Sequence, residues 1–287
     1  MKRRLALFLS ALFVVTVAAS ASAQLTVAKD GPVVYGHHHL NATNIEEQKK
    51  FFVNTLGGTA IKFGANNVEV VKFPNVLIFF RMQAPTGGTK GTSVNHIGFS
   101  VPNLRKTVDK IKADGYQMIT RSEVAATQEV KDDIATLAGR NVPIAFALGP
   151  DSVKVELVEL KDQAAPIALH HVHFFGQQNA EMQAWYVKVF GAKAGPAGGA
   201  FPTATLPGVA LNFSPSPEPV VGTTGRSLDH IGFEVKDLEA FCKKLESMGI
   251  KLTVAYRKVP ALNLAIAFIN DPWGTNIELT EGLDKVS

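Results

Sequence analysis

The chain repeats its own sequence at a fixed spacing, and this repeat restricts the folds open to it more than any other feature. The stretch NHIGFSVPNL, which starts at Asn95, reappears as DHIGFEVKDL from Asp229, 134 positions later. The sequence GHHHL around His37 corresponds at the same spacing to HHVHF around His171. We therefore expect a duplicated chain with two halves, residues 31–163 and residues 164–287.

Each half divides once more into two quarters of similar design. His37 and His96 are 59 positions apart, as are His171 and His230. Every quarter opens with an alternating apolar run, which predicts a strand, and continues with a helical pattern and further β-rich runs. The helices are expected to begin at a capping side chain and to end at a glycine: Asn44 and Gly57, Asn103 and Gly115, Asn179 and Gly191, Asp237 and Gly249. The sequence thus predicts an α+β fold of four βαβββ modules.

An insertion, Ser122–Arg140, makes the second quarter longer than the fourth. The pattern of these residues is typical of a helix. The sequence leaves two placements of this insertion open. It either covers the functional surface of the N-terminal half as a lid or packs on the outside of that half.

The first 23 residues have the pattern of a secretory signal peptide. A basic start, Lys2–Arg4, precedes an apolar run to Ala18, and the small residues at Ala21–Ala23 predict cleavage after Ala23. The apolar run is shorter than the ~20 residues of a membrane-spanning helix. We therefore expect an exported protein, secreted or periplasmic, with no membrane partner after cleavage.

Charge and cysteine content narrow the classes of partner. Removal of the three leader cations from the 29 basic residues leaves 26 against 25 acidic ones, which gives no electrostatic footprint for nucleic acid. The single cysteine, Cys242, excludes an intramolecular disulfide. A small-molecule partner is expected, in a monomer or a homodimer.

All eight histidines lie in the opening strands of the quarters. A single histidine on an apolar strand is more often a hydrogen-bonded core residue than a ligand. Equivalent positions in four repeats favour a shared chemical role instead. Side chains alternate faces along a strand, so the recurring unit is His-x-His: His37 with His39, and His171 with His173. The neighbours His38 and His170 point the other way and are expected to be incidental.

A glutamate follows in the last strand of the second and of the fourth quarter. Glu156 and Glu278 both lie between aliphatic neighbours, and a similar turn precedes each. One such glutamate alone would be interpreted as the solvent face of an edge strand. Two neutral imidazoles and one carboxylate, however, suit a borderline divalent cation and leave coordination positions open, as a catalytic metal requires.

With these motifs the sequence resembles the vicinal oxygen chelate (VOC) superfamily, which groups glyoxalase I, fosfomycin-resistance proteins, bleomycin-binding proteins and extradiol dioxygenases. The resemblance rests on the stretches that begin at His96 and His230, on Trp185–Gly191 and on Asp271–Glu278. It covers essentially the whole chain after the leader. It implies two tandem VOC domains, each with two modules whose strands form a cupped mixed sheet around a metal ion.

The resemblance also implies ligands from the first strand of both modules and the last strand of the second. Within each half these are His37, His96 and Glu156, and His171, His230 and Glu278. Each site would hold one Fe²⁺, Mn²⁺, Ni²⁺ or Zn²⁺ ion. His39 and His173 would face the same cups, either as catalytic groups that bind substrate or move protons, or as supports of the metal ligands.

The sequence leaves the pairing of modules open. Pairing within each half and exchange between the halves are both possible, and exchange would change which glutamate His37 or His171 joins.

Three functions remain open at this point. The leading hypothesis is an exported metalloenzyme that binds two adjacent oxygens of a small substrate, with isomerase, lyase or oxygenase chemistry. An extradiol-type ring-cleaving dioxygenase is the second, although Phe268 and Phe146 stand where that group has a tyrosine. The third is a binding protein of the bleomycin type without turnover. Glyoxalase I also has a glutamate as a fourth protein ligand to its metal. The corresponding segments of this chain, Val76–Phe80 and Val209–Phe213, contain no acidic residue.

Overall fold

The structure is a computed structural model that describes residues 25, 33–137, 141–197, 200–283 and 286. The predicted signal peptide and its cleavage site lie outside the described residues, as do residues 138–140 of the insertion.

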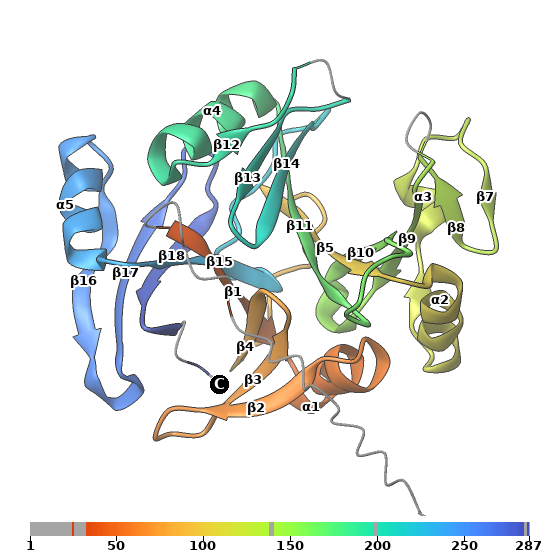
Figure 1. Cartoon of the computed structure of the whole chain (residues 1–287), viewed down its shortest axis with the longest axis horizontal. Helices are drawn as coiled ribbons and strands as arrows, with labels where there is room; N and C mark the ends of the chain where they lie inside the picture. The colour runs from red at the N-terminus through yellow and green to blue at the C-terminus, as the bar shows by residue number, and fades with distance from the viewer. Residues whose placement is uncertain (1–24, 26–32, 138–140, 198–199, 284–285, 287) are drawn as a thin grey trace, which may run out of the picture.

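All four predicted modules form, each with the order βαβββ (Figure 1). Module 1 contains β1 (Val33–Ala42), α1 (Ile45–Lys49) with a π-helical turn (Lys50–Thr55), β2 (Thr59–Phe63), β3 (Val68–Phe73) and β4 (Val76–Met82). Module 2 contains β5 (Val94–Val101), α2 (Leu104–Ala113), β6 (Gln117–Met118), β9 (Pro143–Leu148), a 3₁₀ turn (Pro150–Ser152) and β10 (Lys154–Glu159).

Modules 3 and 4 repeat the arrangement in the second half of the chain. Module 3 contains β11 (Ala168–Gly176), α4 (Asn179–Phe190), β12 (Lys193–Ala194), β13 (Thr203–Leu206) and β14 (Val209–Pro215). Module 4 contains β15 (Leu228–Val235), α5 (Leu238–Ser247), β16 (Leu252–Val259), a 3₁₀ turn (Pro260–Leu262), β17 (Leu264–Asn270) and β18 (Asn276–Glu281).

Helix boundaries follow the predicted signals with one exception. The side chains of Asn44, Asn103 and Asp237 accept hydrogen bonds from backbone N–H groups of the first helical turn. Asn179 was expected to cap α4, but it is the first helical residue, and its amide donates to the carbonyl of Phe213 instead. The four glycines that end the helices all have positive φ, the left-handed conformation that favours glycine: Gly57, Gly115, Gly191 and Gly249.

The insertion in module 2 is mostly not helical, contrary to its sequence pattern. It forms one helical turn, α3 (Thr120–Glu123), followed by a hairpin of β7 (Val130–Lys131) and β8 (Ile134–Thr136). The turn of this hairpin consists of Asp132 and Asp133, both with positive φ, as a two-residue turn between twisted strands requires.

The modules pair across the two halves of the chain. An eight-stranded sheet has the order β16-β17-β18-β15-β1-β4-β3-β2 and joins module 4 to module 1. A ten-stranded sheet has the order β12-β13-β14-β11-β5-β10-β9-β8-β7, with β6 on β9, and joins module 3 to module 2. At each seam the first strands of two modules run antiparallel, β1 beside β15 and β5 beside β11.

This pairing corrects the cups implied within residues 31–163 and within residues 164–287, because neither half forms a sheet of its own. A first strand has one free edge for a partner, and tertiary packing, rather than proximity along the chain, decides which module fills it.

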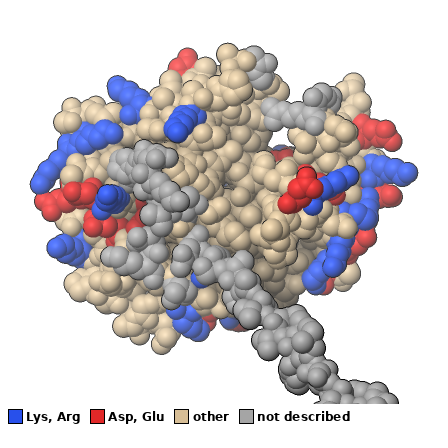
Figure 2. Space-filling view, in the orientation of Figure 1, with Lys and Arg blue, Asp and Glu red and all other residues tan. Residues whose placement is uncertain are grey.

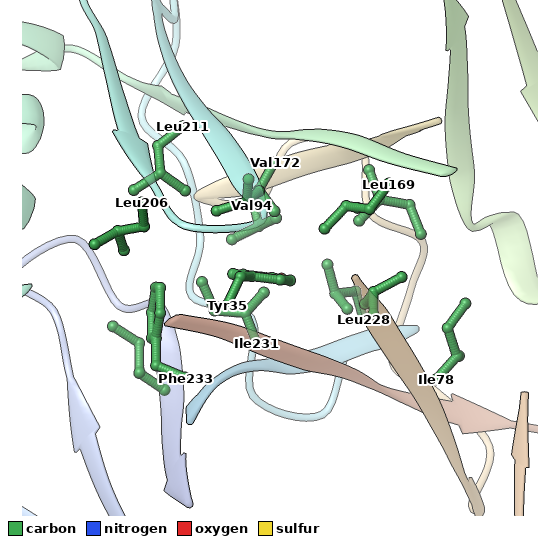
Figure 3. Packing of buried hydrophobic residues seen from close by; sticks show 14 of the residues in the cluster. Tyr35, Ile78, Val94, Leu169, Val172, Leu206, Leu211, Leu228, Ile231 and Phe233 are labelled. Carbon is green, nitrogen blue, oxygen red and sulfur yellow. The ribbon is translucent and has the colours of Figure 1, made fainter. Parts of the chain in front are cut away.

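The main hydrophobic core lies between the two sheets. Figure 3 shows Tyr35, Ile231 and Phe233 of the eight-stranded sheet facing Val172 and Leu211 of the ten-stranded one. These side chains are almost fully buried, and each contributes about 1.5–3 kcal/mol relative to an exposed position. The histidine-bearing faces therefore point away from this core.

On the one face that Figure 2 draws, the described residues carry charges of both signs. Basic and acidic side chains are interspersed there around the rim of the molecule. Within the described part of the chain, no helix combines the length and the apolar character needed to cross a bilayer.

Candidate metal centres

Each sheet carries a cluster of histidines and one glutamate on its face away from the core. We call the histidine-bearing face of the eight-stranded sheet the 1/4 cup and that of the ten-stranded sheet the 2/3 cup, after the modules that form them. The clusters that could hold a metal ion are His37, His230 and Glu278 in the 1/4 cup, and His96, His171, His173 and Glu156 in the 2/3 cup.

In the 2/3 cup the ligand atoms converge on one point. His96 Nε2 lies 2.8 Å from Glu156 Oε2, and His171 Nε2 lies 3.1 Å from the same oxygen. His173 Nδ1 is 3.1 Å from His96 Nε2. All four side chains are buried, and one ligand atom from each lies within 4.8 Å of all the others. This is a donor set of three imidazoles and one carboxylate whose ligand atoms are close enough together to bind a single ion.

Neighbouring groups prepare these donors for a cation. Asn95 Oδ1 lies 2.9 Å from His96 Nδ1, and a proton held there leaves Nε2 free to bind metal. Burial lowers the pKa of His96 to about 4, so the ring is neutral at pH 7. Burial alone would raise the pKa of Glu156, but the adjacent His171 and His96 hold it well below its usual range. Neutral imidazoles and an ionised carboxylate are the forms that metals bind.

A glycine makes room for one ligand in each cup. Gly98 lies two residues after His96 on β5, and a Cβ there would lie 2.1 Å from the ring of His171 on β11. In the 1/4 cup, a Cβ on Gly232 would lie 2.0 Å from the ring of His37. The repeated His-Ile-Gly-Phe sequence thus provides one ligand and the space for another from the partner module.

The 1/4 cup has the same basic geometry with fewer donors. His37 Nε2 and His230 Nε2 lie 2.9 and 3.0 Å from Glu278 Oε2. His230 Nδ1 lies 2.7 Å from the carboxylate of Asp229. Burial opposes a charge on His230, but its bonds to Asp229 and Glu278 raise its pKa. Asp229 stands where the 2/3 cup has the neutral Asn95, so His230 is the more basic ligand.

The two cups differ most in what fills them. The 1/4 cup holds a hydrophobic cluster of Leu25, Val70, Leu77, Phe79, Leu264, Ile266 and Leu283. The ring of Phe79 lies 5.3 Å from that of His37 and 6.1 Å from that of His39. The 2/3 cup instead opens into a cavity of about 650 Å³. The register explains part of the contrast, since His39 pairs with Phe79 whereas His173 pairs with the smaller, polar Asn212.

The insertion forms one wall of the cavity in the 2/3 cup. Glu123, Val124, Gln128 and Leu137 of this segment line the cavity together with the histidines. Neither of the two placements left open by the sequence is observed as stated, because the insertion lines a cup shared by modules 2 and 3 rather than covering a cup of the N-terminal half or decorating the outside.

Several predicted site residues come together in a different grouping. His37 joins His230 and Glu278, and His171 joins His96 and Glu156, so the ligand sets implied within each half are wrong in their partners. His39 and His173 face the cups as expected, with ring centroids 4.5 Å from His230 and 4.6 Å from His96 respectively.

The two histidines expected to be incidental differ from each other. His38 is fully buried on the core side, where Tyr35 Oη lies 2.9 Å from its Nδ1. His170 lines the cavity of the 2/3 cup, and its Nδ1 lies 2.8 Å from His171 Nδ1. His170 therefore touches a candidate ligand rather than being incidental.

Sequence reasoning missed a buried ion pair in the cavity wall. Lys154, only 2% exposed, lies two residues before Glu156 on β10, and its Nζ is 2.7 Å from Glu123 Oε2. The available signal was a lysine on the same strand face as a predicted ligand, but no pattern placed Glu123 beside it.

Comparisons with known proteins agree with this architecture. Residues 168–279, which span most of modules 3 and 4, match the family model described as the Glyoxalase/Bleomycin resistance protein/Dioxygenase superfamily. No curated protein matches the chain in sequence.

Solved structures share the fold over most of the chain. A mutant of glyoxalase I from Zea mays superposes with a TM-score of 0.66 at 18% identity, covering 90% of this chain and 95% of that one. Glyoxalase I from Zea mays itself gives 0.64 at 17% identity, with 88% and 94% covered. A Bacillus subtilis protein described as a candidate dioxygenase gives 0.61 at 12% identity, with 86% and 84% covered. The chain thus has the glyoxalase I-like fold of VOC proteins.

Proposed function

We propose that this protein is an exported, metal-dependent enzyme of the VOC superfamily that acts on a small substrate through two adjacent oxygens in the 2/3 cup. The observation that carries the proposal is the coincidence of a complete donor set with a cavity large enough for a substrate. Export is proposed from the leader sequence alone. The 1/4 cup would bind an ion in a structural role, since an apolar cluster packs in that cup and its Phe79 lies beside His37.

His96, His171 and Glu156 would hold the ion. A divalent ion bound there would supply Lewis-acid chemistry, polarising substrate oxygens and stabilising negative charge that develops on them. The protein's own contribution is to exclude water with the apolar walls of the cavity, Ile144, Phe146, Val158 and Phe175.

His173 is suited to move a proton in this cavity. Its Nε2 lies 2.8 Å from Ser214 Oγ, and both side chains line the cavity. Burial lowers its pKa well below the usual range, so the ring is neutral at pH 7 and a weak base, which suits a substrate proton that a bound divalent ion would make acidic. We therefore assign it the role of general base, with Ser214 fixing the orientation of the ring.

A dioxygenase reaction is a second candidate, because His96, His171 and Glu156 form the two-histidine, one-carboxylate set of non-haem iron oxygenases. Oxygen uptake by the Fe²⁺-loaded protein in the presence of catechols distinguishes this reaction from isomerase or lyase chemistry.

Matched substitutions of the two glutamates test the proposal. Glu156→Gln is expected to remove one of two bound ions and to abolish calorimetric binding of catechol, a ligand with adjacent oxygens, to the Zn²⁺-loaded protein. Glu278→Gln should also remove one ion but leave catechol binding within about twofold, because the ion that Glu278 binds lies in the 1/4 cup and not in the 2/3 cavity. The proposal fails if Glu156→Gln keeps both ions, or if catechol binding follows Glu278.

A further inference from the structure

We propose that the substrate of the 2/3 cup is an anion, whose adjacent oxygens meet the metal and whose separate carboxylate pairs with Lys154. This inference rests on the proposed function, since the metal site is one of the two anchoring points. The 2/3 cavity is lined by both the metal-ligand cluster and Lys154.

Lys154 lies at the right separation to bind a second group of the same molecule. Lys154 and Glu156 occupy the same face of β10, two residues apart, which corresponds to roughly 7 Å along a strand. The ring of Phe146 bridges this gap, with its centroid 5.4 Å from that of His96 and 5.7 Å from Lys154 Nζ. A ligand about one aromatic ring long therefore spans from the metal cluster to Lys154.

The charges around Lys154 leave a positive excess. Glu123 accepts a hydrogen bond from Lys154 Nζ at 2.7 Å and another from Lys90 Nζ at 2.9 Å, so two cations share one carboxylate. Among the described residues that line the cavity, the only other acid is Glu156, which belongs to the metal cluster. A bound divalent ion would add further positive charge, which makes the cavity complementary to an anion.

The surroundings of Lys154 strengthen any pairing that it makes. Its Nζ lies over the rings of Phe146 and Phe175, 5.7 and 5.9 Å from their centroids. Charge-assisted hydrogen bonds are stronger in such water-poor sites than at a surface. A carboxylate that enters the cavity would therefore gain more from Lys154 than from an exposed lysine.

Of the two described cups, only the 2/3 cup has a cation at this position of the last strand. Lys154 is opposite Leu148 in the register of β10 and β9, and Asn276 has the equivalent place opposite Asn270 in β18 and β17. Asn276 donates to Asp229 rather than presenting a charge. The 1/4 cup thus has no cation at this strand position, and the positive charge near its histidines is that of Arg81 on β4, which acts on His39 instead.

Two probes of nearly the same shape test the proposal on the Zn²⁺-loaded protein. Catechol carries adjacent oxygens alone, and 3,4-dihydroxybenzoate adds a carboxylate across the ring. For Lys154→Met, calorimetry is expected to show a Kd for 3,4-dihydroxybenzoate that is roughly tenfold to a hundredfold higher, with the Kd for catechol unchanged within about twofold. Lys90→Met is the matched control, because this lysine binds the same Glu123 but is exposed, and it should change neither Kd appreciably.

A double variant keeps the test informative if the loss of one buried charge disturbs folding. Lys154→Met with Glu123→Met removes both charges and retains their volume, and it should show the same selective loss of 3,4-dihydroxybenzoate binding. Unchanged binding of 3,4-dihydroxybenzoate by the folded variants, with Zn²⁺ content intact, overturns the role of Lys154 and leaves the proposed function standing. If the wild-type protein binds neither Zn²⁺ nor catechol, both proposals fall.

Discussion

At the scale of single residues, the sequence predicted which residues form the candidate sites, but it did not predict which of them lie together in one site. The repeat identified the histidines and glutamates, since side chains at equivalent repeat positions share a face of the sheet. It could not predict that His37 lies beside Glu278, because that contact is set by which first strands pair. Lys154 was missed because its repeat equivalent is the uncharged Asn276, and Glu123 was missed because it enters the cavity from the insertion.

Glycine at position 98 is expected to be essential for the 2/3 cup. In Gly98→Ala the new Cβ meets the ring of His171 at 2.1 Å, so this ligand must move. Metal affinity in that cup should fall by on the order of 10- to 100-fold, measured by titration with Zn²⁺. Gly232→Ala is the matched variant and should weaken only the ion beside His37. Equal affinities at both sites in Gly98→Ala would contradict this role of the glycine.

His173 is expected to matter for turnover more than for metal content. If it is the general base, His173→Gln should lower kcat by about 10²–10⁴-fold and retain two ions per chain. Ser214→Ala, which removes the partner of His173 Nε2, should give a smaller loss of the same kind. Elemental analysis beside steady-state kinetics decides, and loss of one ion in His173→Gln would make this residue a metal ligand instead.

At the scale of elements, sequence patterns predicted local structure well and local exceptions had specific causes. Strand alternation, three of the four caps and the four terminal glycines were confirmed because these signals act within a few residues. The insertion was predicted as a helix, but the left-handed Asp132 and Asp133 turn it into a hairpin. The insertion lines the cavity only because strands far away in the sequence form the rest of the cup, and a local sequence pattern cannot predict that arrangement.

The packing of β4 and β14 decides which cup is hollow, and this can be tested by stability. Phe79→Ala removes a large buried side chain from the cluster in the 1/4 cup and should lower the free energy of unfolding by about 3–5 kcal/mol. Phe201→Ala removes a ring that lines the open cavity and packs on His173, and it should cost less, because this side chain is only half-buried. Urea denaturation measures both, and equal costs would argue against a filled 1/4 cup.

At the scale of the whole molecule, the two halves of the sequence are not two halves of the structure. Each sheet takes one module from either half, so both candidate sites combine ligands from distant parts of the chain. The sequence predicted four modules and their internal order, because these follow from periodicity and turns. It left the exchange open, since similar seams between first strands can form either way.

The metal content of two double variants tests most directly whether each site combines ligands from both halves. His37→Ala with His230→Ala removes two ligands from one site, so we expect one ion per chain to remain. His37→Ala with His96→Ala removes one ligand from each site, so we expect no tightly bound ion. If the first variant loses both ions and the second keeps one, the ligands group within the halves of the chain, and the exchange of modules between the halves is wrong.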